Sequence, residues 1–400
     1  MRIITTLFTF FLFSGTLVAQ TENYWTKKAD FSGLKRERAV AFTVGNKGYV
    51  GTGVDTAEMV LNDFWEYEPL SDTWTQVADL PGVPRRNASA FTIGSKGYVG
   101  VGMNAVDANF GSPLSDFWEY DPSTNTWTQR ANYPSTSIYF ATGFSLGNKG
   151  YICCGKRGPN WYTDEMWEYD PQSDSWTSKP PFPGGVRYQL SSFVVNSSAY
   201  VGLGTDQDLY RNDIWEYKPA QDLWTEKADL PGSERSASHG FGIGNYGFIC
   251  MGANGGLLDD LWEYNPLNNS WSVKAPYGGS NRKNGISFVL YGKAYVGTGK
   301  GYSGKKMSMH EYTPGAYVGL DDMSITGISI FPNPASNKIS IELSSTLIKR
   351  FEIYTLQGTK VLETDFSKFI AVDHLASGAY LLIGKDYSGQ IIGKEKLVIH

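Results

Sequence analysis

Residues 49–77 read YVGTGVDTAEMVLNDFWEYEPLSDTWTQV, and the pattern of this stretch recurs along most of the chain. It contains three signatures: an aromatic residue four positions before a closing glycine, a Trp-Glu-Tyr triplet, and a later Trp followed by Thr or Ser. The first signature occurs at Tyr49–Gly53, Tyr98–Gly102, Tyr151–Gly155, Tyr200–Gly204, Phe248–Gly252 and Tyr295–Gly299. The triplet starts at Trp65, Trp118, Trp167, Trp215 and Trp262, with a degenerate copy at His310–Tyr312. The last signature falls at Trp25, Trp74, Trp127, Trp176, Trp224 and Trp271.

The length of the repeat predicts the architecture. Successive triplets lie 47 to 53 residues apart, and the segments between the punctuating Gly, Pro and Asp residues are short. Segments of four to eight residues are strands rather than helices. Four short strands in a repeat of about 50 residues are typical of a propeller blade. The sequence therefore predicts an all-β, six-bladed β-propeller over residues 20–315, with the repeated Trp and Tyr side chains packed between blades.

The order of the signatures predicts how the ring closes. The chain begins with a Trp strand at Trp25, whereas the last repeat ends at Tyr312 without one. We therefore expect the strand at Tyr24–Lys27 to pair with the strand around Met309–Tyr312 and to complete the sixth blade. This pairing would also remove an exposed sheet edge.

This pattern resembles the kelch repeat family from residue 22 to about residue 315. The resemblance rests on the glycine-ended strand, the aromatic triplet, the later Trp and an Arg ahead of each first strand. The usual Gly-Gly doublet of the family is replaced here by Gly-x-Gly or Cys-x-Gly. The resemblance implies the propeller fold, but it implies no single function, because kelch propellers include both binding scaffolds and enzymes.

The first residues are typical of a secretory signal peptide. Arg2 precedes an apolar stretch that ends at Ala19. We predict that residues 1–19 are removed and that the mature chain begins near Gln20. The apolar stretch is short for a membrane span, and no later segment is apolar enough for one, so no transmembrane segment is expected.

The C-terminal region differs from the repeats. Residues 316–323 are predicted to be a linker, and residues 324–400 alternate apolar and polar side chains as strands of a small β-sandwich do. This region resembles the type A sorting domain of the type IX secretion system of Bacteroidetes. The matching residues are Phe331, Pro332, Asn333, Pro334, Ala335, Ile353, Tyr354, Gly358, Leu375, Gly378, Tyr380, Lys396, Leu397 and Val398.

The resemblance of the tail implies a route of export. Members of that family cross the inner membrane by a signal peptide, and the tail then directs passage across the outer membrane. The chain is therefore expected outside the cell or on its surface, reached through the periplasm, with the type IX secretion machinery as a partner. A plain accessory β-sandwich is the alternative interpretation of this region.

Composition and motifs narrow the classes of function. The net charge is −5 and there is no long basic run, which argues against a nucleic-acid partner. The odd cysteine count gives no disulfide framework, and Cys153, Cys154 and Cys250 are expected to be buried strand residues. There is no Cys/His cluster with metal-ligand spacing, no Gly-x-Ser-x-Gly elbow and no phosphate loop, so neither a metal nor a cofactor is expected.

Charged positions also repeat at the end of the propeller that carries the long, variable loops, which we name the top face. An acid stands two residues before each triplet at Asp63, Asp116, Glu165, Asp213 and Asp260, and blade six has Ser308 there. An Arg stands ahead of the first strand at Arg36, Arg85, Arg187, Arg235 and Arg282, and blade three has Ile138 there. The periodicity favours pairing of these Arg and acid side chains through charge-assisted hydrogen bonds.

The exceptions to this periodicity predict a ligand site. Blade six has Arg282 without the repeat acid, near a group of lysines on the top face: Lys283, Lys300, Lys305 and Lys306. An unpaired cation cluster beside a cavity attracts carboxylate or sulfate groups. Trp161 and Tyr162, in a loop of blade three, could stack on a sugar ring, or Trp161 could pack on its own loop. These residues predict an acidic glycan or acidic peptide as the ligand.

Three functions remain open from the sequence. The leading one is a non-enzymatic module that binds a glycan or a protein at the top face. The second is a secreted carbohydrate enzyme, because bacterial periplasmic kelch propellers include sialic-acid epimerases (mutarotases). In such an enzyme Arg235, His239, Glu234 and Arg282 would grip and deprotonate the sugar. The third is a structural surface protein without a specific ligand.

Overall fold

The computed structural model describes residues 23–105, 111–206, 209–315, 328–343, 348–355, 360–385 and 391–400. The expected signal peptide, the expected linker and Gly358 of the sorting motif lie outside these residues.

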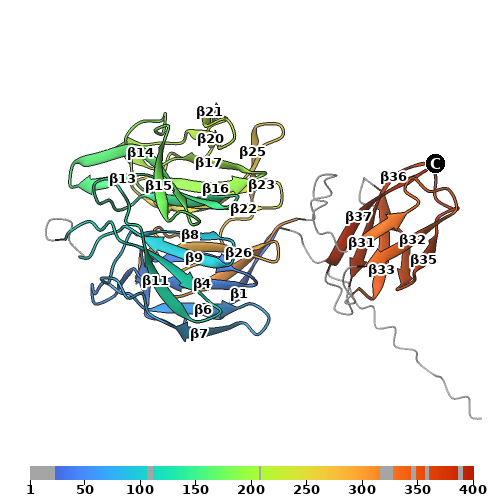
Figure 1. Ribbon diagram of the computed structural model, residues 1–400, viewed down its shortest axis with the longest axis horizontal. Coiled ribbons are helices and arrows are strands. Elements are labelled where there is room, and N and C mark those ends of the chain that lie inside the picture. Colours follow the sequence, from blue (N-terminus) through green and yellow to red (C-terminus); the bar gives the residue numbers. More distant parts are fainter. Residues whose placement is uncertain are drawn as a thin grey trace, which may run out of the picture.

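Six antiparallel sheets of four strands form the N-terminal part of the chain (Figure 1). Blade one is β3 (Val40–Val44), β4 (Lys47–Gly51), β6 (Phe64–Glu68) and β7 (Thr73–Val77). Blade two is β8 (Ser89–Ile93), β9 (Lys96–Gly100), β10 (Phe117–Asp121) and β11 (Thr126–Arg130). Blade three is β12 (Thr142–Leu146), β13 (Lys149–Gly158), β14 (Trp161–Asp170) and β15 (Ser175–Lys179).

The second half of the propeller repeats this order. Blade four is β16 (Ser191–Val195), β17 (Ser198–Gly202), β20 (Ile214–Lys218) and β21 (Leu223–Lys227). Blade five is β22 (His239–Ile243), β23 (Tyr246–Ala253), β24 (Leu257–Asn265) and β25 (Ser270–Lys274). Blade six is β26 (Ile286–Leu290), β27 (Lys293–Gly297), β30 (Met309–Thr313) and β1 (Tyr24–Lys28). Short strands in the top loops form two-stranded ribbons. The pairs are β2 (Arg36–Glu37) with β5 (Val54–Asp55), β18 (Thr205–Asp206) with β19 (Leu209–Tyr210), and β28 (Lys300–Gly301) with β29 (Gly304–Lys305).

The six blades form a closed ring. The first strand of each blade contacts the first strand of the next, and β26 returns to β3. The N-terminal strand β1 pairs with β30, with Trp25 opposite Tyr312 and Lys28 opposite Met309. The six-bladed propeller closed by its N-terminal strand is thus confirmed.

Aromatic side chains hold neighbouring blades together. The Trp of each outermost strand donates its indole N–H to a backbone carbonyl in the segment that follows the preceding outer strand. The bonds run from Trp25 to Ala275, Trp74 to Ala29, Trp127 to Ala78, Trp176 to Ala131, Trp224 to Pro180 and Trp271 to Ala228, at 2.8 to 3.4 Å. The repeated Trp therefore packs between blades and also satisfies a backbone acceptor there.

The glycine that ends each first signature is required by the backbone. Gly53 has a φ of 98°, and a Cβ there would lie 2.7 Å from the carbonyl oxygen of Glu37. Its backbone N–H donates to the carbonyl of Arg85 in the next blade at 2.8 Å. The five equivalent glycines repeat this bond, and Gly299 closes the circle by donating to Arg36 of blade one. A side chain at these positions would break the contact between blades.

Cys153 and Cys250 occupy positions where the other four blades have glycine. Gly51 lies opposite Phe64, and a Cβ on Gly51 would meet that ring at 2.4 Å. In blade three Cys153 instead lies opposite Met166, and in blade five Cys250 lies opposite Leu261. All three cysteines are buried and free, as expected.

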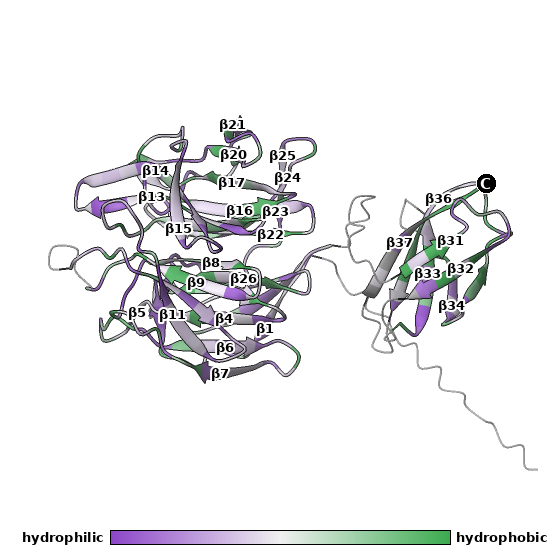
Figure 2. Ribbon diagram, in the orientation of Figure 1, coloured by the Kyte–Doolittle hydropathy of each residue, from purple (hydrophilic) through white to green (hydrophobic). Residues whose placement is uncertain are grey.

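The C-terminal part is a two-sheet β-sandwich with its own core. One sheet is β31 (Ile328–Phe331), β32 (Lys338–Leu343) and β35 (Phe369–Ala371). The other is β34 (Lys360–Asp365), β33 (Arg350–Thr355), β36 (Gly378–Lys385) and β37 (Ile391–Ile399). Ile339, Phe351 and Leu382 belong to a buried cluster drawn from residues 328–399 alone. Figure 2 shows hydrophobic and hydrophilic stretches alternating along the strands of this sandwich and of the propeller.

Candidate functional site

Six equivalent residues surround the propeller axis at the top face, and we name them the axial ring. Each lies two positions after the repeat Arg or its replacement and has a positive φ of 55 to 62°. Each donates its backbone N–H to the carbonyl of the ring member in the preceding blade, at 2.8 to 3.2 Å, so that the bonds close a circle. The ring members are Arg38, Asn87, Phe140, Gln189, Ala237 and Asn284. The backbone is therefore held identically in every blade, while the side chain is free to differ.

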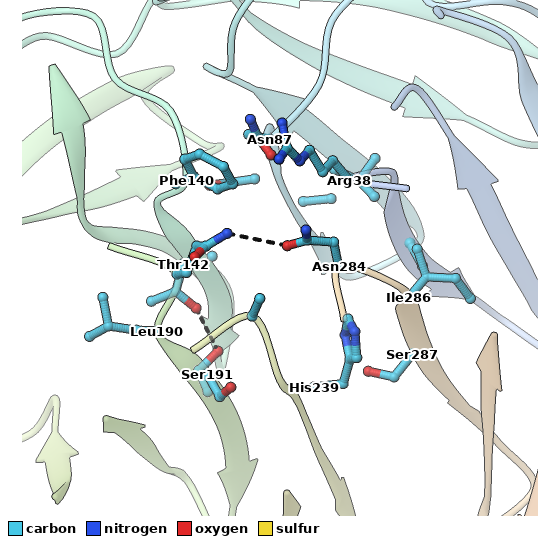
Figure 3. Close-up of a pocket in the computed structure, with 18 of the residues that line it drawn as sticks. Arg38, Asn87, Phe140, Thr142, Leu190, Ser191, His239, Asn284, Ile286 and Ser287 are labelled. Carbon is cyan, nitrogen blue, oxygen red and sulfur yellow. Dashed lines mark hydrogen bonds between the residues drawn. The ribbon is translucent and has the colours of Figure 1, made fainter. Parts of the chain in front are cut away.

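The axial ring lines a cavity of about 260 Å³, which we name the axial cavity (Figure 3). Arg38, Asn87, Phe140 and Asn284 lie around the same space over the axis. Hydroxyl groups on the first strands, or directly before one, complete the wall: Ser89, Thr142, Ser191, Ser192, Ser238 and Ser287. The cavity is small beside ordinary ligand pockets of about 300–1,000 Å³. Its size and its many donors and acceptors fit a small polar group.

A hydrogen-bonded network spans the cavity wall. Asn284 donates from Nδ2 to the buried Glu37 carboxylate at 3.0 Å, and its Oδ1 accepts from Gln189 Nε2 at 3.2 Å. Gln189 Oε1 in turn accepts from the Ser236 hydroxyl at 3.2 Å. Four blades thus contribute to one network, which fixes the rotamers of the amides before any ligand enters.

Two donors in the ring lack a hydrogen-bond acceptor among the described residues: Arg38 Nε and Asn87 Nδ2. The Arg38 guanidinium lies over the Phe140 ring at 5.5 Å and 3.6 Å from the Glu37 carboxylate, which offsets its charge. Buried donors are normally bonded to protein or water, and leaving one unpaired is costly. Both nitrogens are closed off from solvent, and Arg38 Nε is the atom that lies 3.6 Å from Glu37, so a ligand acceptor reaches them only if these side chains turn toward the cavity.

His239 lines the same cavity as a neutral ring. Burial, together with the nearby Arg282 charge, lowers its pKa to about 4. Its Nε2 accepts the backbone N–H of Gly285 at 2.9 Å, so the proton of the neutral ring resides on Nδ1. His239 therefore offers a donor, and its basic nitrogen is already occupied.

Two further cavities lie outward from the axial one on the top face. The first, of about 240 Å³, shares Gln189 with the axial cavity and is also lined by Tyr188, Tyr210 and Lys283. The second, of about 370 Å³, shares Tyr210 and Lys283 with the first and adds Lys300 and Tyr302. We name them the middle and outer cavities.

The repeat Arg and acid residues pair within their blades, as the periodicity indicates. Arg85 donates two hydrogen bonds to the Asp116 carboxylate, at 2.7 and 2.5 Å, and Arg235 donates two to the Asp260 carboxylate, at 2.5 and 2.7 Å. Blade three, which lacks the repeat Arg, supplies Arg157 to Glu165 at 2.6 Å. Arg235 is fully buried and therefore does not face the axial cavity, contrary to its expected role as a ligand residue.

Arg282 is also buried rather than presented to a ligand. Its guanidinium bonds Thr298 O at 3.0 Å and Ser308 Oγ at 3.1 Å, and it lies 4.9 Å from the centre of the Tyr277 ring. Burial lowers its pKa from the ordinary value. Lys305 is likewise buried, because its ammonium bonds Asp55 O and Glu58 of blade one at 2.6 and 2.7 Å. The expected cation cluster is thus split, and two of its members hold loops together.

The remaining candidates from the sequence lie on the top face. Lys300 is exposed at the outer cavity, and Lys306 bonds Ser303. Trp161 is 56% exposed and has the Arg157 guanidinium 5.5 Å from its ring. Tyr162 stacks on Tyr188 with 5.3 Å between ring centroids, and Lys156 caps both rings. Of these four candidates, Lys300 alone lines one of the three cavities. Among the other residues singled out from the sequence, His239 lines the axial cavity and Lys283 lines the middle and outer cavities.

Sequence reasoning missed the axial ring. The signal available was positional: the residue two places after each repeat Arg varies from Arg to Asn, Gln, Phe and Ala while its surroundings stay constant. Variation at one fixed backbone position is what a ligand-facing position shows. Within the described residues, no group of His, Cys, Asp and Glu side chains is arranged to hold a metal ion. The described part of the chain also contains no helix long and apolar enough to cross a membrane.

Comparisons with known proteins agree with this fold. Residues 16–201 match the family model described as the KLHDC2/KLHL20/DRC7 Kelch-repeats domain, and residues 329–400 match the secretion system C-terminal sorting domain. The chain is a kelch-repeat β-propeller protein with a type IX C-terminal sorting domain. The solved structure titled "Structure of YjhT" aligns with a TM-score of 0.60 and 14% identity, over 78% of this chain and 99% of its own. That likeness shows the fold. The comparison with curated proteins gives no match.

In this kelch protein the sorting domain joins its motif to its last strand. Asn333 Oδ1 accepts the Val398 N–H at 2.8 Å, and the Ala335 N–H donates to Val398 O at 2.8 Å. Tyr380 is buried, and its hydroxyl donates to Ala376 O at 2.7 Å. The motif residues therefore build the sandwich, and the tail indicates export from the cell.

Proposed function

We propose that this protein is an extracellular carbohydrate-binding propeller that holds a sugar unit in the axial cavity. The single observation that carries the proposal is a small cavity on the propeller axis whose wall presents hydroxyls, amides and the Arg38 side chain. Sugar hydroxyls both donate to and accept from groups of this kind, and Phe140 offers an apolar ring face beside them. A protein ligand fits less well, since the cavity admits only a small group.

The test is a glycan-array screen of the full chain, followed by calorimetry on the hits. Asn87→Ala should weaken binding at least about tenfold, as expected when a buried hydrogen-bond donor to a ligand is lost. The backbone tolerates this change, because Ala237 already occupies the equivalent ring position with the same positive φ. Asn46→Ala, in an exposed turn at the opposite end, is the control. Absence of any sugar ligand, or equal effects of both variants, would refute the proposal.

A sialic-acid epimerase is the second candidate, because Arg38 and a neutral His239 line one cavity and could serve as a carboxylate grip and a proton-transfer group. The bond from Gly285 N–H to His239 Nε2 favours binding over catalysis, since the basic nitrogen is already engaged. Following the anomers of N-acetylneuraminic acid by NMR decides between the two. Faster mutarotation with the protein, abolished in His239→Gln, would make it an enzyme.

A further inference from the structure

The three cavities lie in a row on the top face, and each shares wall residues with the next. Gln189 belongs to both the axial and the middle cavity, and Tyr210, Ala253 and Lys283 belong to both the middle and the outer cavity. The row therefore runs outward from the axis over blades four, five and six. A single sugar unit would fill one cavity and leave the other two vacant.

The charge along the row is one-sided. None of the described residues that line the three cavities carries a carboxylate. At the axial end the charge of Arg38 is offset by Glu37 behind it. At the outer end Lys283 and Lys300 have no salt bridge within the described part of the chain, whereas the nearby Lys305 and Arg211 are each paired with an acid. Unpaired positive charge is thus concentrated at the far end of the row.

The two lysines are held in place by their backbones. Lys283 N–H donates to Lys300 O at 3.1 Å, and Lys300 N–H donates to Lys283 O at 2.8 Å. Their ammonium groups therefore project from adjacent, fixed positions. Because both line the outer cavity, an anion there could contact both, and such charge-assisted bonds are among the stronger polar contacts.

Tyrosines and glycines give the row the surface of a sugar-binding groove. Tyr188 and Tyr210 line the middle cavity, and Tyr302 lines the outer one with 79% of its surface exposed. The hydroxyl of Tyr302 accepts the Leu257 N–H at 3.0 Å, which anchors one edge of the ring. Gly255 and Gly256 leave the outer wall open. Aromatic rings of this kind present an apolar face and a polar tip.

We infer that the ligand is an acidic oligosaccharide of at least three units, with one unit in each cavity. This inference rests on the proposed function and deepens it. One sugar unit occupies the axial cavity against Asn87 and Asn284. A carboxylate or sulfate group occupies the outer cavity against Lys283 and Lys300.

The experiment measures how affinity depends on chain length and charge. The full chain is titrated calorimetrically with oligogalacturonates, oligoalginates and chondroitin sulfate fragments of increasing length, and with methyl-esterified oligogalacturonates as the uncharged match. We expect at least one acidic series to gain about tenfold in affinity from monomer to trimer and to weaken with added salt, which screens exposed charges. The esterified chains should show neither effect.

Variants separate the ends of the row. Lys283→Ala with Lys300→Ala should remove the gain with length and leave the affinity for the monomer unchanged. Lys96→Ala with Lys149→Ala removes the same charge at the opposite end of the propeller and should change nothing. Monomer binding without any gain with length, equal binding of esterified chains, or indifference to the Lys283 and Lys300 changes would overturn the inference alone. Failure of every monomer and oligomer to bind would overturn the proposed function with it.

Discussion

At the scale of single residues, Ser308 and His310 in blade six depart from the repeat together. In the other blades the triplet Trp donates its indole N–H to the acid two positions earlier, as Trp118 does to Asp116 at 2.7 Å. Without the acid, that N–H would have no such acceptor, and His310 instead hydrogen-bonds the Tyr277 hydroxyl through Nδ1 at 3.0 Å. The two substitutions are thus physically coupled, and together they leave Arg282 without a carboxylate.

Restoring both repeat residues should stabilise the propeller. Ser308→Asp with His310→Trp would give Arg282 a carboxylate partner and give that carboxylate an indole donor. Charge-assisted bonds of this kind contribute about 1.5–3 kcal/mol each. Chemical denaturation should show that the double variant gains more free energy of unfolding than the two single variants gain in sum. A double variant no more stable than the native chain would contradict the coupling.

Stability should fall in two steps on acidification. Burial, with the Arg282 charge, lowers the pKa of His310 to about 4, whereas an unfolded histidine titrates near its ordinary value of about 6.5. Between these values the unfolded chain binds a proton that the folded chain does not, so stability decreases as pH falls through this window. His239 contributes to the same loss of stability, because its folded-state pKa is also about 4.

The second step belongs to the paired acids. Burial alone would raise the pKa of Asp116, but the hydrogen bonds and charge of Arg85 and the Trp118 indole lower it overall. Its contribution is present above the unfolded pKa of about 3.9 and is lost as pH falls through the lower folded value. Thermal melts across this range should show both steps. His310→Phe should reduce the first step, whereas His374→Gln, at an exposed site in the sorting domain, should not.

At the scale of elements, each blade is tied to its neighbours by more than packing. The axial ring and the glycine-to-Arg bonds form two closed circles of backbone hydrogen bonds, and the Trp bonds form a third at the outer strands. Blade six joins the third circle through β1, because Trp25 of this strand donates to Ala275 of blade five. The Tyr312 hydroxyl of β30 also donates to Asn23 Oδ1, directly before β1. The N-terminal strand therefore completes the outer wall of the propeller.

Deleting residues 20–28 should lower the melting temperature of the propeller and promote self-association. The deletion removes every β1–β30 bond and leaves β30 as an unpaired edge that can pair with another chain. Calorimetry and size-exclusion chromatography measure the two effects. Trp25→Ala keeps the edge covered and should lower the melting temperature without association. An unchanged melting temperature after the deletion would show that β1 does not hold the ring closed.

At the scale of the whole molecule, the propeller and the sorting domain have separate cores. The buried cluster of the sandwich contains no residue before Ile328, and the propeller clusters contain none after Tyr312. The boundary proposed between them, within residues 316–323, lies outside the described residues. Separate cores favour separate unfolding transitions.

Removing residues 324–400 should leave a folded propeller that is not exported. In a type IX-competent host the truncated chain is expected to remain in the periplasm, because the sorting domain directs the last crossing. Cell fractionation measures its location, and circular dichroism of the purified fragment measures its fold. Surface delivery of the truncated chain would contradict the role of the tail. A single unfolding transition of the full chain would contradict the independence of the two cores.

The amino-acid sequence by itself determined the number of blades, the closure through Trp25 and the nature of the tail. It could do so because the residues that pack between blades must recur at the same place in every repeat, and the glycines must recur where the backbone leaves no room for a Cβ. The pairing of the repeat Arg with the repeat acid followed from the same periodicity. These features are local and repeated, so pattern alone reveals them.

The tertiary structure alone decided which polar side chains meet at the axis and which charges are exposed. Arg38, Asn87 and Asn284 come from three blades and converge only when the ring closes, so no local pattern joins them. Arg282 and Lys305 looked like free cations in the sequence, yet both are buried by contacts with distant segments. Charge can be read from the sequence, but its access to solvent depends on what the fold places over it.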